Sequence, residues 1–167
     1  MAKPACHIVF VCTGNTCRSP LAEALCKKLL ADQLGCTVEQ LPEREFVVHS
    51  AGLAAIMGGG AAAEAVEVGR ELGVDLTGHR SQPLSPELAE QADYLVAMTA
   101  GHLWSMAYQY PDLAGRCRLL NPDGDDLPDP IGCDQEVYRE CARAISQHLQ
   151  GLVAEILAAD ESRYTKE

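Results

Sequence analysis

Basic residues are scarce in this chain of 167 residues. It has 13 lysines and arginines against 24 aspartates and glutamates, which gives a net charge of −11 at pH 7. A protein that binds nucleic acid needs a cluster of Lys and Arg to neutralise phosphates, and the sequence contains none. We therefore expect no nucleic-acid partner. An anionic ligand would have to be held by local dipoles and single arginines rather than by the field of the whole protein.

Long apolar runs are absent as well. Hydrophobic residues make up 47% of the chain, but no run reaches the roughly 20 residues that a transmembrane helix needs. An apolar strand follows Cys6 and His7 almost at once, which leaves no room for a signal-peptide pattern. We expect a cytoplasmic, monomeric, globular protein with a single domain over residues 1–167 and no contact with a membrane.

The eight cysteines lack the spacing of a metal or disulfide framework. No Cys-x-x-Cys pair occurs among them, although such pairs are typical of zinc sites. Thiols of a cytosolic protein usually stay reduced. We therefore expect no metal ion and no other cofactor. The cysteines are at positions 6, 12, 17, 26, 36, 117, 133 and 141.

Short apolar strands alternate with helical segments along the chain. This order is typical of a doubly wound α/β fold with about four parallel strands and helices on both faces. Ligands of such folds bind at the carboxyl ends of the strands. Ser19 is a candidate N-cap of the first helix, and Pro20 would take its first position. Strands are expected at 7–11, 45–50, 94–98 and 116–120, and helices at 19–34, 61–72, 85–91, 100–108 and 135–158.

The turn between the first strand and the first helix reads Cys12-Thr13-Gly14-Asn15-Thr16-Cys17-Arg18-Ser19. Successive backbone N–H groups and a helix N-terminus favour an oxyanion at such a turn. The same field favours the nucleophilic thiolate of Cys12. Arg18 adds a planar charged fork that matches phosphate oxygens. A nucleotide-binding loop would end in Gly-Lys-Ser/Thr, so that alternative fails. The other alternative is that Cys12 is a buried structural thiol.

The longer string from Val11 to Glu23, Val-Cys-Thr-Gly-Asn-Thr-Cys-Arg-Ser-Pro-Leu-Ala-Glu, closely resembles the low-molecular-weight protein tyrosine phosphatase family. Within that family it is most similar to the bacterial protein arginine phosphatase branch. The resemblance extends over most of the chain and includes residues 50–52, residues 78–81 and Asp129-Pro130. It implies a cysteine-dependent hydrolase that acts on phosphorylated proteins.

The resemblance implies a role for each residue of the loop. Cys12 would attack phosphorus and form a cysteinyl-phosphate, while Arg18 and the backbone N–H groups of residues 13–19 hold the equatorial oxygens. Asn15 would hold the shape of the loop, since asparagine tolerates left-handed backbone geometry. Ser19 would donate a hydrogen bond to Cys12, which competes with its use as a helix cap.

Three further residues are expected near the loop. Ser50 and His79 would brace it from other segments, although the alternative for His79 is an ordinary surface histidine. Cys17 lies five residues beyond Cys12. It would either close a reversible disulfide with an oxidised Cys12 or simply pack beneath the loop.

Asp129 is the candidate general acid. A poor leaving group needs a proton, and the same carboxylate would then act as base toward the water that hydrolyses the thiophosphate. The alternative is an aspartate that only forms a turn before proline, because Asp123, Asp125 and Asp126 belong to the same acidic loop.

Two residues bear on the substrate. In the family, tyrosine-directed members carry isoleucine at the position of Thr16, whereas arginine-directed members carry threonine. Tyrosine-directed members also place aromatic residues after the Asp-Pro pair, but Ile131 follows here and no aromatic residue lies near that loop. A hydroxyl at Thr16 and acidic residues at the rim would favour a guanidinium over a phenol. We therefore expect phosphoarginine in proteins as the substrate, with phosphotyrosine as the alternative.

Two other classes share part of this pattern. A thioredoxin-coupled arsenate reductase needs further cysteines on a mobile segment, and residues 73–98 contain none. A phosphoprotein-binding module without activity would be expected to lose the nucleophile or the acid. Cys12, Arg18 and Asp129 are all present, which favours an enzyme over a binding module.

Overall fold

A four-stranded parallel sheet forms the centre of the molecule. The computed structural model describes residues 5–164, with side chains as far as residue 162. The strand order is β2-β1-β3-β4, so β1 lies in the interior and pairs with both β2 and β3. This architecture confirms the predicted doubly wound fold. The strands are β1 (Cys6–Cys12), β2 (Phe46–Gly52), β3 (Tyr94–Ala97) and β4 (Cys117–Leu119).

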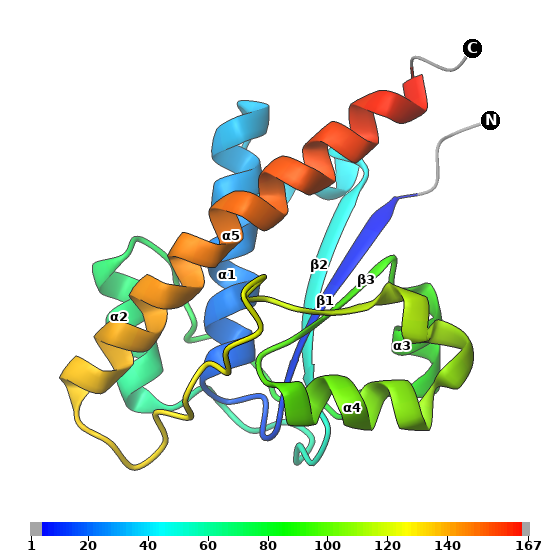
Figure 1. Cartoon of the computed structure of the whole chain (residues 1–167). Coiled ribbons are helices and arrows are strands. Elements are labelled where there is room, and N and C mark those ends of the chain that lie inside the picture. Colours follow the sequence, from blue (N-terminus) through cyan, green and yellow to red (C-terminus); the bar gives the residue numbers. More distant parts are fainter. Residues whose placement is uncertain (1–4, 165–167) are drawn as a thin grey trace.

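Helices cover both faces of the sheet (Figure 1). One core joins Ile8 and Phe10 of β1 to α1 (Arg18–Leu34), α2 (Ala63–Glu71) and α5 (Gln135–Tyr164). A second core joins Val9 and Val11 to α3 (Pro86–Gln91) and α4 (Ala100–Gln109). Successive side chains of a strand point to opposite faces, so a strand buried on both sides must be apolar throughout. This requirement explains the unbroken apolar run of β1.

The first helix does not begin as predicted. It starts at Arg18, and the preceding residue, Cys17, makes no side-chain capping bond. The expectation that Ser19 caps the helix was therefore wrong, because its hydroxyl is turned toward Cys12 and Asn15 instead. Pro20 is the third helical residue, where its missing N–H costs nothing since the first turn has no intrahelical acceptor.

Other boundaries differ from the prediction by a few residues. Strand β2 continues to Gly52 because Ala51 and Gly52 keep their register with Val11 and Cys12. The last helix extends to Tyr164 rather than ending near residue 158. Three short 3₁₀ helices were not predicted: Val38–Gln40, Pro42–Arg44 and Pro111–Arg116.

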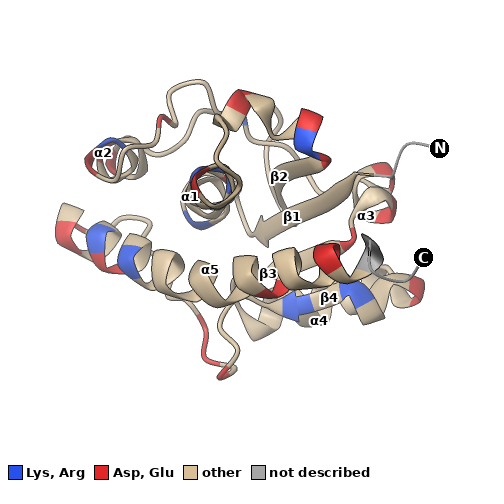
Figure 2. Ribbon diagram, turned by 90° about the horizontal axis from the view of Figure 1, so that it is seen from above, with Lys and Arg blue, Asp and Glu red and all other residues tan. Residues whose placement is uncertain are grey.

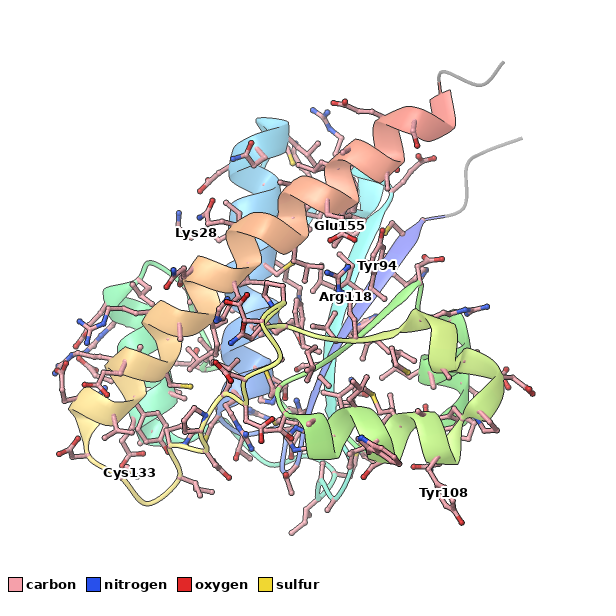
Figure 3. The ribbon with its side chains drawn as sticks, in the orientation of Figure 1. Lys28, Tyr94, Tyr108, Arg118, Cys133 and Glu155 are labelled. Carbon is pink, nitrogen blue, oxygen red and sulfur yellow. The ribbon has the colours of Figure 1, made fainter. Side chains whose placement is uncertain are left out.

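Ion pairs fix α5 against its neighbours. Arg139 of α5 forms two hydrogen bonds with Glu71 of α2, and the charged ends of both helices lie side by side in Figure 2. Farther along, Glu155 accepts two hydrogen bonds from Arg118 of β4, and the two side chains point toward one another in Figure 3. Exposed pairs of this kind contribute little energy singly, but these two link α5 to helix α2 and to the edge strand β4. None of the helices within residues 5–164 combines the length and apolar character needed to cross a bilayer.

Candidate active site

The turn between β1 and α1 is a tight, mostly buried loop, here called the phosphate loop (residues 12–19). Cys12 is the last residue of β1 and Arg18 the first of α1. Asn15 has a φ of 56°, the left-handed geometry that asparagine tolerates better than most residues. Gly52 lets the loop pass close to β2, because a Cβ at this position would lie 3.0 Å from the backbone nitrogen of Asn15. The last residue of the neighbouring strand β2 therefore helps to shape the loop.

Asn15 is the centre of the hydrogen bonds that hold the loop. Its Nδ2 donates to Ser19 Oγ at 2.8 Å and to Ser50 Oγ at 2.9 Å. Its Oδ1 accepts from the backbone nitrogen of Gln82 at 3.0 Å. His79 Nε2 lies 2.7 Å from the carbonyl oxygen of Asn15 and donates to it. Both polar atoms of the Asn15 side chain are thus bonded. Ser50 contacts this side chain and His79 contacts the backbone carbonyl of Asn15, and the bracing role expected of both residues stays a prediction.

The hydrogen bonds around Ser19 determine which atom donates in its contact with Cys12. Ser50 donates to Glu23 Oε1 at 2.8 Å, so its oxygen is free to accept from Asn15. Ser19 accepts from the same amide, which leaves its own hydrogen available to Cys12 Sγ at 2.9 Å. The backbone oxygen of Ala51, at 3.5 Å, is the more distant acceptor. The amide of Asn15, oriented by the N–H of Gln82, therefore leaves the hydrogen of Ser19 for the sulfur, and Glu23, to which no role was assigned from sequence, accepts the hydrogen of Ser50.

Arg18 joins the phosphate loop to the acidic loop (residues 121–134). Its side chain is almost fully buried, and Nη1 donates to the carbonyl oxygen of Leu127 at 2.9 Å. Nη2 lies 3.5 Å from Asp129 Oδ2. The backbone nitrogen of Leu127 in turn donates to the carbonyl of Met98, at the end of β3. These contacts bring Asp129 to the cavity from a segment more than 100 positions away.

Asp129 makes two different contacts. Its Oδ1 accepts from the backbone nitrogen of Ile131 at 3.1 Å, which is the turn expected of an aspartate before proline. Its Oδ2 faces Arg18, and 47% of the side chain is exposed. The carboxylate therefore forms the turn and also reaches the cavity. This cavity has a volume of about 30 Å³ and is lined by Cys12, Gly14, Thr16, Cys17, Arg18, Asp129 and Ile131.

Cys17 lies beneath the loop against α5. Its Sγ is 3.4 Å from the hydroxyl oxygen of Tyr138, which is buried. Burial raises the pKa of the Cys17 thiol, and the hydrogen bond with Tyr138 opposes this effect. Burial likewise raises the pKa of Cys141 on the next turn of α5, to about 11. Tyr138 also corrects the expectation that no aromatic residue lies near the acidic loop, although it is buried and forms no open wall. All eight cysteines are free, and a disulfide between Cys12 and Cys17 stays a prediction.

Thr13 and Thr16 are held differently. Thr16 lines the cavity, and its carbonyl accepts from the backbone nitrogen of Ala62 just before α2. Thr13 Oγ1 lies 2.9 Å from Nε2 of His102, a buried histidine in the first turn of α4. His102 Nδ1 is buried with no hydrogen-bond partner among the described residues. A buried acceptor nitrogen without a hydrogen bond costs less free energy than a buried N–H group without one. We therefore assign the hydrogen to Nε2, which donates to Thr13.

A cavity of this size, with one sulfur and one arginine on its walls, suits a tetrahedral oxyanion such as a phosphoryl group. Within residues 5–164 no group of three or more His, Cys, Asp or Glu is placed to hold a metal ion. A parallel α/β sheet with a cysteine at the carboxyl end of β1 and an arginine at the start of α1 describes the cysteine-dependent phosphatases.

The chain belongs to the low molecular weight phosphotyrosine protein phosphatase family, whose model matches residues 7–162. It is 37% identical to the protein-arginine-phosphatase of Geobacillus stearothermophilus over 160 residues, which cover 93% of this chain and 98% of the relative. It is 32% identical to the low molecular weight protein-tyrosine-phosphatase Wzb of Escherichia coli (strain K12) over 155 residues, or 89% and 97% of the two chains.

A solved structure agrees with these relatives. The YwlE arginine phosphatase from Geobacillus stearothermophilus superposes with a TM-score of 0.80 at 33% identity, and the match covers 96% of this chain and 98% of that one. The protein is thus a protein phosphatase, a hydrolase, as the sequence predicted. Its relatives include enzymes named for arginine and for tyrosine.

Proposed function

We propose that the protein removes phosphate from phosphoarginine residues of other proteins, through a cysteinyl-phosphate on Cys12. The observation that carries the chemistry is one cavity bordered by Cys12, Arg18 and Asp129. Phosphotyrosine is the alternative substrate within the same family. Relatives of both kinds match the chain, and those named for arginine are 36% and 37% identical to it over the aligned residues, against 32% for Wzb.

In the first step, Cys12 Sγ attacks phosphorus and the bond from phosphorus to the guanidine nitrogen breaks. Arg18 and the backbone N–H groups of the phosphate loop hold the three equatorial oxygens. Asp129, as the carboxylic acid, passes its proton to the departing nitrogen. Ser19 keeps a hydrogen bond on the sulfur, 2.9 Å away, which stabilises the thiolate before attack. The products are the unphosphorylated arginine residue of the substrate protein and the cysteinyl-phosphate.

In the second step, water attacks the phosphorus of the intermediate. Asp129, now a carboxylate, takes the proton of this water, and the sulfur–phosphorus bond breaks. Inorganic phosphate leaves, and both Cys12 and Asp129 return to their starting forms. The half-exposed position of Asp129 supports this role, since the same oxygen must reach a substrate in one step and water in the next.

The walls of the cavity support phosphoarginine over phosphotyrosine. Thr16 offers a hydroxyl that can accept a hydrogen bond from a guanidinium, whereas a phenyl ring gains nothing from it. Ile131 also lines the cavity, where the tyrosine-directed pattern calls for an aromatic ring. The acidic loop adds carboxylates that attract the positively charged leaving group, as in other guanidinium sites.

The test is a pair of peptides that differ only in carrying phosphoarginine or phosphotyrosine. We expect a higher kcat/KM for phosphoarginine and no phosphate release from either peptide with Cys12→Ser. Thr16→Val removes only the hydroxyl and should shift the ratio toward phosphotyrosine, while Thr16→Ser keeps the hydroxyl and should preserve it. A higher kcat/KM for phosphotyrosine in the parent enzyme would overturn the substrate, though not the phosphatase chemistry.

A further inference from the structure

Exposed apolar side chains are concentrated on the segments that contact the phosphate loop. Among the described residues, five large hydrophobic side chains are more than half exposed, and all five lie on three segments that hydrogen-bond to the phosphate loop. The loop after β2 bonds to the backbone of Thr13, and helix α4 bonds to the side chain of Thr13. The third segment, the acidic loop, bonds to Arg18. The five residues are Ile56 (83%), Met57 (71%), Trp104 (77%), Tyr108 (90%) and Ile131 (61%). Exposed apolar groups concentrated at one place indicate a contact surface.

Helix α4 contributes the largest part of this surface. Trp104 and Tyr108 are one turn apart, so they lie on the same side of the helix. Gly101 and Ser105 are exposed beside them, and no residue of Ala100–Gln109 is charged. In Figure 3, Tyr108 projects away from the body of the molecule, on the side where the strands end. The stripe from residue 101 to residue 108 is about 10 Å long, which matches about three residues of an extended chain.

The charge beside the stripe is negative. Asp126 Oδ1 accepts from the backbone nitrogen of Ala100 at 2.7 Å, so the acidic loop and the start of α4 are in contact. Asp123 and Asp125 of the same loop are exposed, and the loop contains no lysine or arginine. The arginine of the cavity, Arg18, is buried within it. A bound segment would therefore place its phosphoryl group on Arg18 and its flanking residues against aromatic rings and carboxylates.

We infer that Trp104 and Tyr108 bind the residues that flank the phosphorylated residue of the substrate protein, and that this flanking segment is extended and basic. The inference rests on the proposed function for the position of the phosphoryl group. Lysine and arginine stack well on exposed aromatic rings and are attracted by the acidic loop. A second copy of this chain carries the same charge of −11 and would be repelled. The anionic surface of a membrane would be repelled as well.

The test compares three phosphopeptides that carry one phosphorylated residue each, flanked on both sides by three arginines, three serines or three glutamates. The phosphorylated residue is phosphoarginine or phosphotyrosine, whichever the enzyme hydrolyses faster. We expect the lowest KM for the arginine peptide. The double substitution Trp104→Ser/Tyr108→Ser should raise that KM by about five-fold. It should leave the KM of the serine peptide, and both kinetic constants for para-nitrophenyl phosphate, unchanged. Val38→Ser removes an exposed apolar side chain far from the site and serves as the matched control.

A second variant keeps the test decisive if the double substitution unfolds the protein. Ser105→Lys places a positive charge within the stripe without removing any contact, and should raise KM for the arginine peptide while lowering it for the glutamate peptide. Equal KM values for the three peptides in the parent, or no change on Ser105→Lys, would overturn the docking surface. The docking surface would also be overturned if the parent enzyme self-associates, and if Trp104→Ser abolishes this self-association without changing KM for the arginine peptide. Hydrolysis of para-nitrophenyl phosphate that persists in these cases would leave the proposed chemistry intact.

Discussion

The two loops that meet at the cavity are built in opposite ways. In the phosphate loop, Asn15, Arg18 and Ser19 are buried. Asn15 bonds to Ser19 and to Ser50 of β2, and Arg18 bonds to the carbonyl oxygen of Leu127. In the acidic loop, most residues are exposed, and few bonds hold it to the rest of the molecule: those of Asp126, Leu127 and Asp129 near the cavity, and those of Asp134 at the start of α5.

This difference separates two demands of the proposed reaction. The loop that holds the phosphoryl group must keep its donors fixed, because transition-state stabilisation depends on donors that need no rearrangement. The carboxylate must instead reach a leaving group and then water. The comparison predicts that substitutions in the phosphate loop change stability and activity together, whereas those in the acidic loop change activity alone.

Among substitutions that keep the nucleophile, the largest effect is expected from Arg18. Arg18→Lys keeps the charge but loses the planar fork, so it cannot bond to Leu127 and to phosphate oxygens as a pair. We expect kcat/KM for para-nitrophenyl phosphate to fall by about a hundred- to a thousand-fold. Steady-state kinetics on the folded variant measure this. A loss below about three-fold would mean that Arg18 does not hold the phosphoryl group.

Asp129→Asn comes next. It keeps the size of the side chain and the turn to Ile131, since an amide oxygen can accept that bond. The loss of the proton donor should lower kcat about a hundred-fold for a substrate with a poor leaving group, and less for a good one. The melting temperature should stay near that of the parent. A large drop in melting temperature would contradict the claim that substitutions in the acidic loop change activity alone.

Asn15→Ala should affect both properties. It removes the bonds to Ser19, Ser50 and Gln82 and leaves an alanine at a positive φ. We expect the free energy of unfolding to fall by about 3 kcal/mol and kcat to fall with it, because Ser19 loses its orientation. Urea unfolding gives the first quantity. Unchanged stability with reduced kcat would show that the phosphate loop is not as strongly coupled to the core as its bonds indicate.

The smallest effect concerns pH. Burial and then Arg18 lower the pKa of His102 from 6.5, while Asp126 and Asp129 oppose this. Above pH 6.5 the imidazole is neutral in folded and unfolded chains and contributes nothing. As the pH drops below 6.5, the unfolded chain takes up the proton before the folded protein does, so stability decreases as the pH decreases. Burial also lowers the pKa of His49, which acts in the same direction.

His102→Gln should therefore make the melting temperature decline less steeply below pH 6.5, and His49→Gln should add to this. The measurement is a series of thermal unfolding curves from neutral to mildly acidic pH. An identical decline in the parent and in His102→Gln would rule out the histidine as the source.

The sequence predicted the parts of this site that depend on neighbours in the chain. Cys12, Asn15 and Arg18 are in one short segment, where the strand, turn and helix signals already require their positions. Ser19 shows the limit of local signals, because a cap and a sulfur contact compete for one hydroxyl. The amide of Asn15, oriented by the distant N–H of Gln82, decides between them.

Contacts made by distant segments could not be predicted in this way. His102 is 89 positions from Thr13, and Tyr138 is 121 positions from Cys17. A lone histidine in a helix and a lone tyrosine in another carry no periodic signal that points to the loop. The doubly wound order of the elements brings the carboxyl ends of β1 and β3 to one edge, but the side chains that meet there follow from packing.

The most direct test of the account is to trap the covalent intermediate. Asp129→Asn should still be phosphorylated by an aryl phosphate with a good leaving group but hydrolyse the intermediate slowly, so rapid quenching and peptide mass spectrometry should locate one phosphoryl group on Cys12. The same treatment of Cys12→Ser/Asp129→Asn should give no cysteinyl-phosphate and no turnover. Turnover without a phosphorylated Cys12, or a phosphoryl group on a different residue, would contradict the proposal.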